Sequence, residues 1–298
     1  GHYDTVFPEN ISQPFQLVNE QCATGSGIVD MKGGLAIMVH ALKEVLPQVD
    51  STKYSVVCVL NADEEVGTGE SRGHIVENAR QSFAALSFEP GHNGAWSVQR
   101  KGVTAFQVHA TGVGGHAGAD YKKGGSAIQE LIVKLNRLYE LQDKSKDISV
   151  NIGVISGGTA DNVLAPTAYA YGEVRSWDPA ELERLHQAIQ DICAAPALPG
   201  ANTTLTFPDS HPPCPATEAS LQLFETAKEI GQSLGLSPHL VATGGASDIA
   251  FAAQANIPVL DGLGMEGGGM HTTEEYADLT KVDKQLMLAV LLMKKLLG

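Results

Sequence analysis

The sequence has 298 residues, 43% of them hydrophobic, and a formal net charge of −14 at pH 7. This length is enough for two modest domains or one large one, with a sizeable core. The negative charge argues against a nucleic-acid partner, because phosphate binding needs a basic surface. No run approaches the ~18 apolar residues of a membrane span. We therefore expect a soluble protein with neither nucleic acid nor membrane as partner.

The cysteines and the first residues bear on compartment and completeness. Cys22, Cys58, Cys193 and Cys214 form no C-x-x-C pair, so neither a thiolate zinc site nor a redox motif is predicted. Scattered thiols slightly favour the cytoplasm over the periplasm, and the compartment stays unknown. The sequence starts at Gly1, in what looks like the end of a strand, without an initiator methionine or a signal peptide. We expect part of the N-terminus to be missing.

Strand and helix patterns alternate over the first hundred residues. Residues 1–8 look like the tail of a buried strand, and residues 35–46 have helical periodicity that stops at Pro47. The β-branched run at 54–60 is typical of a buried strand. A short helix at 71–79 and a short strand at 84–88 follow. This order predicts an α/β domain with a mainly parallel sheet and flanking helices.

The pattern changes at about residue 101. Strands are expected at 103–111, 148–156, 168–177 and 203–207, and helices at 126–141 and 179–194. Asp178 is the expected N-cap of the second helix, with Pro179 in its first turn. The order β-α-β-β-α-β is the ferredoxin-like signature. We expect an inserted α+β domain at 101–210, between catalytic segments 1–100 and 211–298.

The α/β pattern returns in the last third of the chain. Helices are predicted at 219–234, in a segment that ends at Ala255, and at 282–297. Short strands are predicted at 239–242 and 258–260, and the second of them leads into a glycine-rich loop. These elements complete the domain that the first hundred residues begin.

Seven ionisable side chains lie in loops that follow the predicted strands of the α/β domain: His2, Asp4, Asp30, Glu64, Glu65, Glu89 and His271. Open α/β sheets place their sites at the carboxyl ends of strands. Imidazoles combined with carboxylates suit zinc, cobalt or manganese, and imidazole favours the first two. A pair of divalent ions needs a bridging carboxylate. Asp30, which lies between flexible glycines, is the candidate bridge.

Neighbouring positions suggest separate roles. His2 and Asp4 face the same way on an extended chain, so Asp4 can fix the tautomer of His2. Glu64 and Glu65 cannot both point the same way, so one can bind metal while the other acts as general base. The alternatives are a helix N-cap at Asp30, a solvated acidic loop at 64–65, and simple turns around Glu89 and His271.

Five motifs in order resemble the dizinc aminopeptidase and carboxypeptidase superfamily. They are HYDTV at 2–6, GIVDMKGG at 27–34, DEEVG at 63–67, FEP at 88–90 and the glycine-rich loop before His271. That family includes bacterial glutamate carboxypeptidase, aminoacylase, acetylornithine deacetylase and succinyl-diaminopimelate desuccinylase, and the first is the most similar in its motifs. The resemblance implies two divalent ions, zinc first and cobalt or manganese as alternatives. It implies His2 and Glu89 on one ion, Glu65 and His271 on the other, Asp30 as bridge before a cis peptide, and Glu64 as general base.

The inserted domain resembles the family's lid domain. GGHAG at 114–118 resembles a lid motif whose histidine, here His116, steadies the oxyanion in the active site of a partner subunit. Asn162 resembles a lid asparagine that contacts substrate across the dimer, and Arg175 lies on a strand where relatives also carry arginine. The resemblance therefore implies a homodimer formed through the lid domain.

One position departs from the pattern. Glutamate carboxypeptidases carry a substrate-binding arginine before the turn that DSHPP occupies at 209–213, and His211 stands in its place. Imidazole does not reproduce the bidentate guanidinium fork. We predict a dizinc hydrolase that cleaves an amide next to a free carboxylate in a small peptide or N-acyl amino acid. An N-acyl-amino-acid deacylase is the alternative within the family, and a non-catalytic homologue is the alternative from another class.

Overall fold

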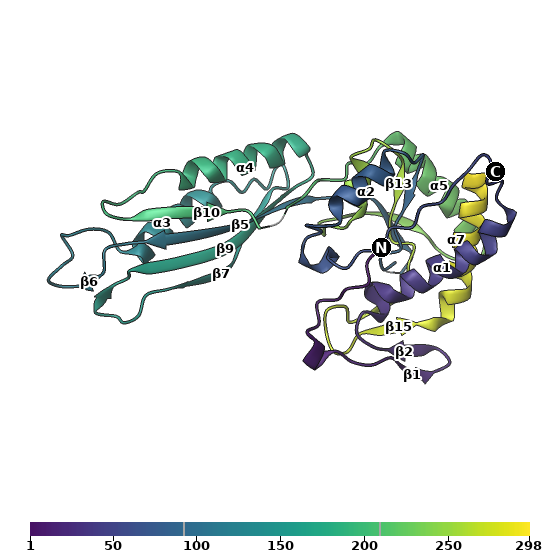
Figure 1. Cartoon of the computed structure of the whole chain (residues 1–298), viewed down its shortest axis with the longest axis horizontal. Helices are drawn as coiled ribbons and strands as arrows, with labels where there is room; N and C mark the ends of the chain where they lie inside the picture. Colours follow the sequence, from purple (N-terminus) through teal and green to yellow (C-terminus); the bar gives the residue numbers. More distant parts are fainter. Residues whose placement is uncertain (92, 209) are drawn as a thin grey trace. The chain divides into compact units, whose positions relative to one another are not determined.

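The computed structural model describes residues 1–91, 93–208 and 210–298, and the chain forms two compact units (Figure 1). Unit 1 comprises Gly1–Arg100, Cys214–Thr243 and Ser247–Gly298. Unit 2 comprises Lys101–Pro213 and Gly244–Ala246. The first predicted boundary, 100/101, agrees with the structure. The second predicted boundary is 210/211, whereas in the structure the chain returns to unit 1 after Pro213.

The predicted helices of unit 1 are present. They are α1 (Gly33–Val45), α2 (Arg72–Ala79), α5 (Glu218–Ser233), α6 (Ile249–Ala253) and α7 (Val282–Leu297). Helix α1 ends where Pro47 interrupts the hydrogen-bond ladder, in the short turn Leu46–Gln48. Helix α5 is capped by the hydroxyl of Thr217, which accepts the N–H of Ser220. Further single turns lie at Glu9–Ile11, Glu64–Val66 and Leu279–Lys281.

The strands of unit 1 correct the expectation of a mainly parallel sheet. One sheet is antiparallel, in the order β1 (Gln16–Asn19), β2 (Cys22–Thr24), β15 (Tyr276–Asp278), β14 (Gly267–Gly268). Parallel pairing joins β12 (His239–Thr243) to β4 (Ala95–Arg100), and β13 (Val259–Leu260) to β3 (Ala85–Leu86). The antiparallel strands are short and mostly half-exposed, so they carry no long apolar run that would predict them.

The predicted buried strand at 54–60 is wrong. Within the described residues this segment joins no sheet, and Val57 and Leu60 are 55% and 47% exposed. Its backbone is hydrogen-bonded at its two ends: the Tyr54 N–H donates to the carbonyl of Asp50 at 3.0 Å, and the Gly1 amino group donates to the carbonyl of Val59 at 3.1 Å. A strand needs a ladder partner, and this run instead lines a groove of about 420 Å³ beside α1 and α7.

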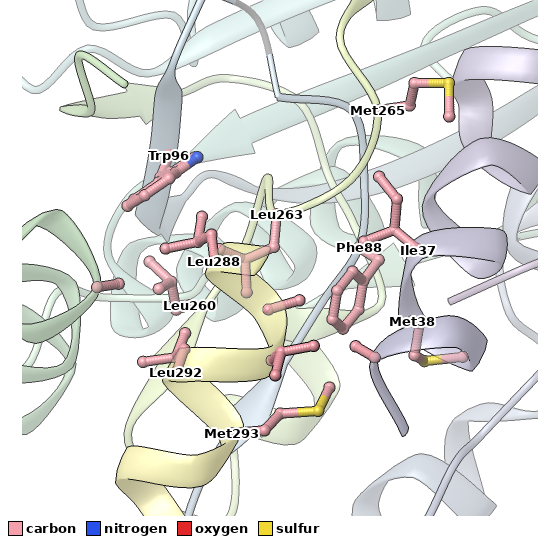
Figure 2. Close-up of a cluster of buried hydrophobic side chains, with 14 of the residues drawn as sticks. Ile37, Met38, Phe88, Trp96, Leu260, Leu263, Met265, Leu288, Leu292 and Met293 are labelled. Atoms are coloured by element: carbon pink, nitrogen blue, oxygen red, sulfur yellow. The ribbon is translucent and has the colours of Figure 1, made fainter. Parts of the chain in front are cut away.

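The main hydrophobic core of unit 1 determines the position of the backbone just after β3. Helices α1, α5 and α7 pack around Phe88, and part of this cluster is drawn in Figure 2. A Cβ at Gly34 would lie 1.9 Å from the carbonyl oxygen of Phe88, and one at Gly264 would lie 2.0 Å from it. Only glycine permits such close approach. Because both positions are glycine, residues 34 and 264 pack directly against the backbone immediately before Glu89.

Unit 2 follows the order β-α-β-β-α-β predicted from the sequence. Its main elements are β5 (Gly102–Thr111), α3 (Ala127–Tyr139), β7 (Ser149–Gly157), β9 (Thr167–Ser176), α4 (Pro179–Cys193) and β10 (Asn202–Thr206). The sheet is antiparallel in the order β10-β5-β9-β7, and β11 (Ser210–His211) also pairs with β5. A small pair joins β6 (Gly115–His116) to β8 (Val163–Leu164).

Both helices of unit 2 pack on its sheet around one core that includes Phe106, Leu131 and Leu185. Asp178 caps α4 as predicted, because its carboxylate accepts the N–H of Ala180 at 2.8 Å. None of the helices in the described parts of either unit combines the length and apolar character needed to cross a membrane.

Candidate active site

Five predicted metal ligands of unit 1 meet around Asp30. Its Oδ1 lies 3.2 Å from Nε2 of His2, and its Oδ2 lies 3.1 Å from Nε2 of His271. On the first side, Oε1 of Glu89 is 3.7 Å from the His2 nitrogen. On the second side, Oε1 of Glu65 is 3.6 Å from the His271 nitrogen. Each oxygen of Asp30 therefore faces one imidazole, and each imidazole lies beside one further carboxylate.

Five separate segments deliver these side chains, and Glu65 comes from the turn Glu64–Val66. Asp30 lies in Ile28–Lys32, just before α1, and its peptide bond to Met31 is cis, as the resemblance implied. His2 is held by a parallel bridge to Asn61, and Glu89 follows β3. His271 follows the glycine-rich loop and has a left-handed φ of +64°, a conformation that is uncommon for a residue with a Cβ.

Asp4 orients His2, but not through the contact expected. Nδ1 of His2 lies 3.2 Å from the backbone carbonyl oxygen of Asp4. A carbonyl can only accept, so Nδ1 carries a proton, and Nε2 is the nitrogen that faces Asp30. The Asp4 carboxylate Oδ1 is 3.3 Å from the ring and makes no hydrogen bond within the described residues. Its Oδ2 accepts the N–H of Glu65 at 3.0 Å, which ties the two motifs together.

Glu64 lies in the turn Glu64–Val66, with Oε2 4.0 Å from Nε2 of His2. Burial, followed by the nearby charge of Glu89, raises the pKa of Glu64 to about 9. Burial also raises the pKa of Glu89 to about 7, although the nearby His2 ring opposes this. Burial alone would lower the pKa of His2, but the hydrogen bond to Asp30 and the nearby carboxylate of Glu89 outweigh it and raise that pKa to about 11.

The donor set fits divalent cations. Ligand atoms of His2, Asp30 and Glu65 lie within 4.8 Å of one another. Oε1 of Glu89 is buried and has no hydrogen-bond partner among the described residues, as expected of an oxygen built to face a cation. Buried carboxylates that repel one another are stabilised by added positive charge. Imidazole nitrogens combined with carboxylate oxygens suit zinc.

In unit 2, His116 and Asn162 come together on neighbouring segments. His116 pairs with Val163 of β8, and the N–H of Ala117 donates to the carbonyl of Asn162 at 2.9 Å. Nδ1 of His116 accepts the N–H groups of Gly118 and Ala119 at 3.1 and 3.3 Å. In the neutral imidazole Nε2 must then carry the hydrogen, so this exposed ring presents a donor.

The other predicted substrate residues are placed differently. Arg175 donates from Nε and Nη2 to the carboxylate of Glu173 at 2.7 and 3.0 Å, and from Nη1 to the carbonyl of Gly244 at 2.6 Å. A substrate carboxylate would have to displace Glu173. His211 is buried on β11 beside Val103, and Asp209 of the same motif lies outside the described residues.

Comparison with known families assigns the chain. The family model described as peptidase family M20/M25/M40 matches residues 1–297. The chain belongs to this family. It is therefore a metallopeptidase-type hydrolase, and the resemblance seen in the five motifs is confirmed.

Relatives of this M20/M25/M40 peptidase cover nearly all of the chain. Carboxypeptidase G2 of Pseudomonas sp. (strain RS-16) is 32% identical over 306 residues, which is 99% of this chain and 72% of the relative. The aminopeptidase PepT from Bacillus cereus ATCC 10987 has a TM-score of 0.74 at 22% identity, over 100% of this chain and 79% of that chain. The metallo-carboxypeptidase Sso-CP2 from Sulfolobus solfataricus has a TM-score of 0.70 at 14% identity, over 94% and 78% of the two chains. The two structural matches show the shared fold.

Two buried carboxylates of the M20/M25/M40 peptidase were missed by sequence reasoning. Glu275 is 2% exposed and accepts the backbone N–H groups of Gly27, Val29 and Asp30 at 2.7, 2.8 and 3.1 Å. Its only sequence signal is its place just after the His271 loop.

The second missed carboxylate, Asp248, is 7% exposed and precedes α6 without capping it. It accepts the Asn61 amide at 2.7 Å and the Thr68 hydroxyl at 2.6 Å. These two donors flank the turn that carries Glu64 and Glu65, so Asp248 closes the base of that loop.

Proposed function

We propose that the chain is a cocatalytic dizinc hydrolase that cleaves an amide bond next to a free carboxylate. One observation carries the proposal. The two oxygens of Asp30 face His2 and His271 at 3.2 and 3.1 Å, and each side has its own second carboxylate. His2 and Glu89 would hold one ion and Glu65 and His271 the other, with cobalt or manganese as alternatives to zinc. Such ions polarise a substrate carbonyl and lower the pKa of a nearby water.

Glu64 is the proposed general base. It lies beside the ligand set but is not needed to complete either side of Asp30. A carboxylate beside the ions, but not bound to them, can take a proton from water and return it. Glu64 receives a proton from the attacking water and passes it to the leaving nitrogen.

His116 is the proposed oxyanion donor, acting in the active site of a second subunit. Its Nδ1 is occupied by two backbone N–H groups, which leaves Nε2–H free to donate. Unit 2 also offers a surface for a dimer. The strand β7 lies at the end of the sheet order, with Val154 and Ile155 46% and 60% exposed, and an unpaired apolar edge invites pairing with another copy.

Two observations bear on the substrate class. A relative called a carboxypeptidase, 32% identical, supports a peptidyl substrate with a free terminal carboxylate. His211 at the position expected for a carboxylate-binding arginine supports the alternative, an N-acyl-amino-acid deacylase. Asn162 and Arg175 are the other candidate contacts.

A substrate panel tests the proposal. Chelator-treated protein is reloaded with zinc, cobalt or manganese and assayed on N-acyl and peptidyl amino acids, each paired with its C-terminal amide. We expect metal-dependent cleavage of the free acids and little cleavage of the amides. Cleavage of simple N-acyl amino acids alone would favour the deacylase. Absence of hydrolysis by protein that holds metal would favour a non-catalytic homologue and contradict the proposal.

A further inference from the structure

Glu275 lies where two ligand loops of unit 1 meet. It directly precedes β15, whose Tyr276 pairs with Thr24 of β2. Strand β2 runs into the loop that carries Asp30, and the His271 loop runs into β15. The Glu275 side chain crosses between them, and its backbone N–H donates to the carbonyl of Thr272 at 3.3 Å.

Among the described residues, the hydrogen bonds that the Glu275 carboxylate accepts all come from backbone N–H groups. Oε1 accepts from Val29 and Asp30, and Oε2 accepts from Gly27. Among the described residues no lysine or arginine pairs with it. A buried carboxylate costs free energy unless strong hydrogen bonds offset its lost hydration. The hydrogen bonds from Gly27, Val29 and Asp30 therefore offset the free-energy cost of burying the Glu275 carboxylate.

We propose that Glu275 is a positioning residue that sets the separation of Asp30 and His271, and thereby the affinity of the ion on the Glu65/His271 side. This inference rests on the proposed dizinc site. His271 is half-exposed and has a left-handed φ, so its own surroundings hold it weakly. Glu275 lies four residues after His271 in the chain, and the hydrogen bond that it accepts from the Asp30 N–H supplies the missing restraint.

The two ions should respond differently to loss of this restraint. The His2/Glu89 side is held separately, because His2 bridges to Asn61 and the backbone before Glu89 is packed against glycines. The Glu65/His271 side depends on the loop that Glu275 joins to Asp30. Loss of Glu275 should therefore weaken one zinc much more than the other.

The variant Glu275→Gln tests this, with Glu274→Gln as its control. Glutamine keeps one acceptor oxygen but turns an amide toward a backbone N–H, which places two donors face to face. Glu274 is the exposed neighbour, so its variant removes the same charge without removing a hydrogen bond to residues 27–30. Zinc binding to chelator-treated protein is followed by calorimetry, and amide exchange at residues 27–30 is followed without metal.

We expect Glu275→Gln to weaken one of two zinc sites about 10–100-fold and to speed exchange at residues 27–30, while Glu274→Gln changes neither. Equal weakening of both sites, or faster exchange with unchanged zinc binding, would overturn the proposal. If Glu275→Gln does not fold, Glu275→Asp decides, since it keeps the charge but withdraws the carboxylate by one methylene. If the parent binds two zinc ions but cleaves no substrate, the proposed function fails, and zinc affinity and amide exchange still test the role of Glu275.

Discussion

The imidazole of His271 reaches the carboxylate of Asp30 across 241 residues of sequence, with Nε2 and Oδ2 3.1 Å apart. The antiparallel pairing of β2 with β15 makes this approach possible, because it brings the segments before Asp30 and after His271 side by side. The site thus depends on a short, half-exposed sheet as much as on the main core.

The variant Glu64→Gln should abolish turnover while leaving metal content intact. Glutamine has nearly the same shape but cannot accept a proton from water, and loss of a general base typically costs about 10²–10⁴-fold in rate. Steady-state kinetics together with metal analysis of the purified variant check this. The exposed Glu77 of α2 provides a control, since Glu77→Gln should behave like the parent. Turnover of Glu64→Gln within tenfold of the parent would rule out this role.

The metal-free protein should become less stable as pH rises from about 5 to about 9. The pKa of Glu64 is raised from 4.5 to about 9 and that of His2 from 6.5 to about 11. The folded state then binds more protons than the unfolded state in this window, so the free energy of unfolding falls with pH. Thermal melts in chelator measure the slope, which Glu64→Gln should reduce.

Zinc should reduce or reverse that slope, because metal binds the deprotonated ligands more tightly as pH rises. Melts with and without zinc over the same pH range make the comparison. A metal-free protein whose Tm climbs between about pH 5 and pH 9 would show that the protonation of the site has the opposite sign.

Alanine at Gly34 should destabilise unit 1 by roughly 1–3 kcal/mol and weaken zinc binding. Its Cβ would lie 1.9 Å from the backbone carbonyl of Phe88, which cannot move without moving Glu89. Urea unfolding and a zinc titration are the measurements. Gly73 in α2 is the matched control, since a Cβ there meets nothing within 4 Å. Gly73→Ala should be neutral or stabilising by about 0.5–1 kcal/mol.

The variant Asp248→Asn should loosen the loop that carries Glu64 and Glu65. Asparagine keeps an oxygen at only one of the two positions that accept from Asn61 and Thr68, so zinc affinity should fall about 10-fold or more and the turnover rate should fall with it. Asp50 is the control. It accepts the N–H and the hydroxyl of Thr52 on an exposed loop, so Asp50→Asn should leave both measurements unchanged.

The variant Ile155→Lys should prevent dimer formation through β7. A charge at a residue that is 60% exposed costs the monomer little, but it opposes pairing along the apolar edge. Light scattering should show a monomer that retains zinc and loses activity about 10²–10³-fold, since His116 would no longer reach a partner's site. Leu221→Lys on α5 is the control. A fully active monomer would contradict the trans role of His116.

The group of side chains that meets around Asp30 could be predicted, because each one sits in a short motif with strong local chemistry. Asp30 among glycines and Glu64 beside Glu65 are visible without any knowledge of the fold. Glu275 and Asp248 could not be found this way. Their partners lie 245 and 187 residues away, and at Glu275 these partners are backbone N–H groups, which every residue but proline possesses.

The secondary structure shows the same difference between features set by neighbouring residues and features set by distant ones. Helix α4 was predicted closely, because Asp178, Pro179 and its apolar spacing all act within a few residues. The segment at 54–60 has the composition of a strand but lacks a ladder partner among the described residues. Strand formation depends on a second segment that composition does not specify.

The spread of the proposed ligands along the chain decides the order in which they are synthesised. His2, Asp30 and Glu89 are translated before the inserted unit 2, and His271 is translated after it. If the proposed pair of metal positions is correct, the one that uses His271 can be completed only after unit 2 has been synthesised.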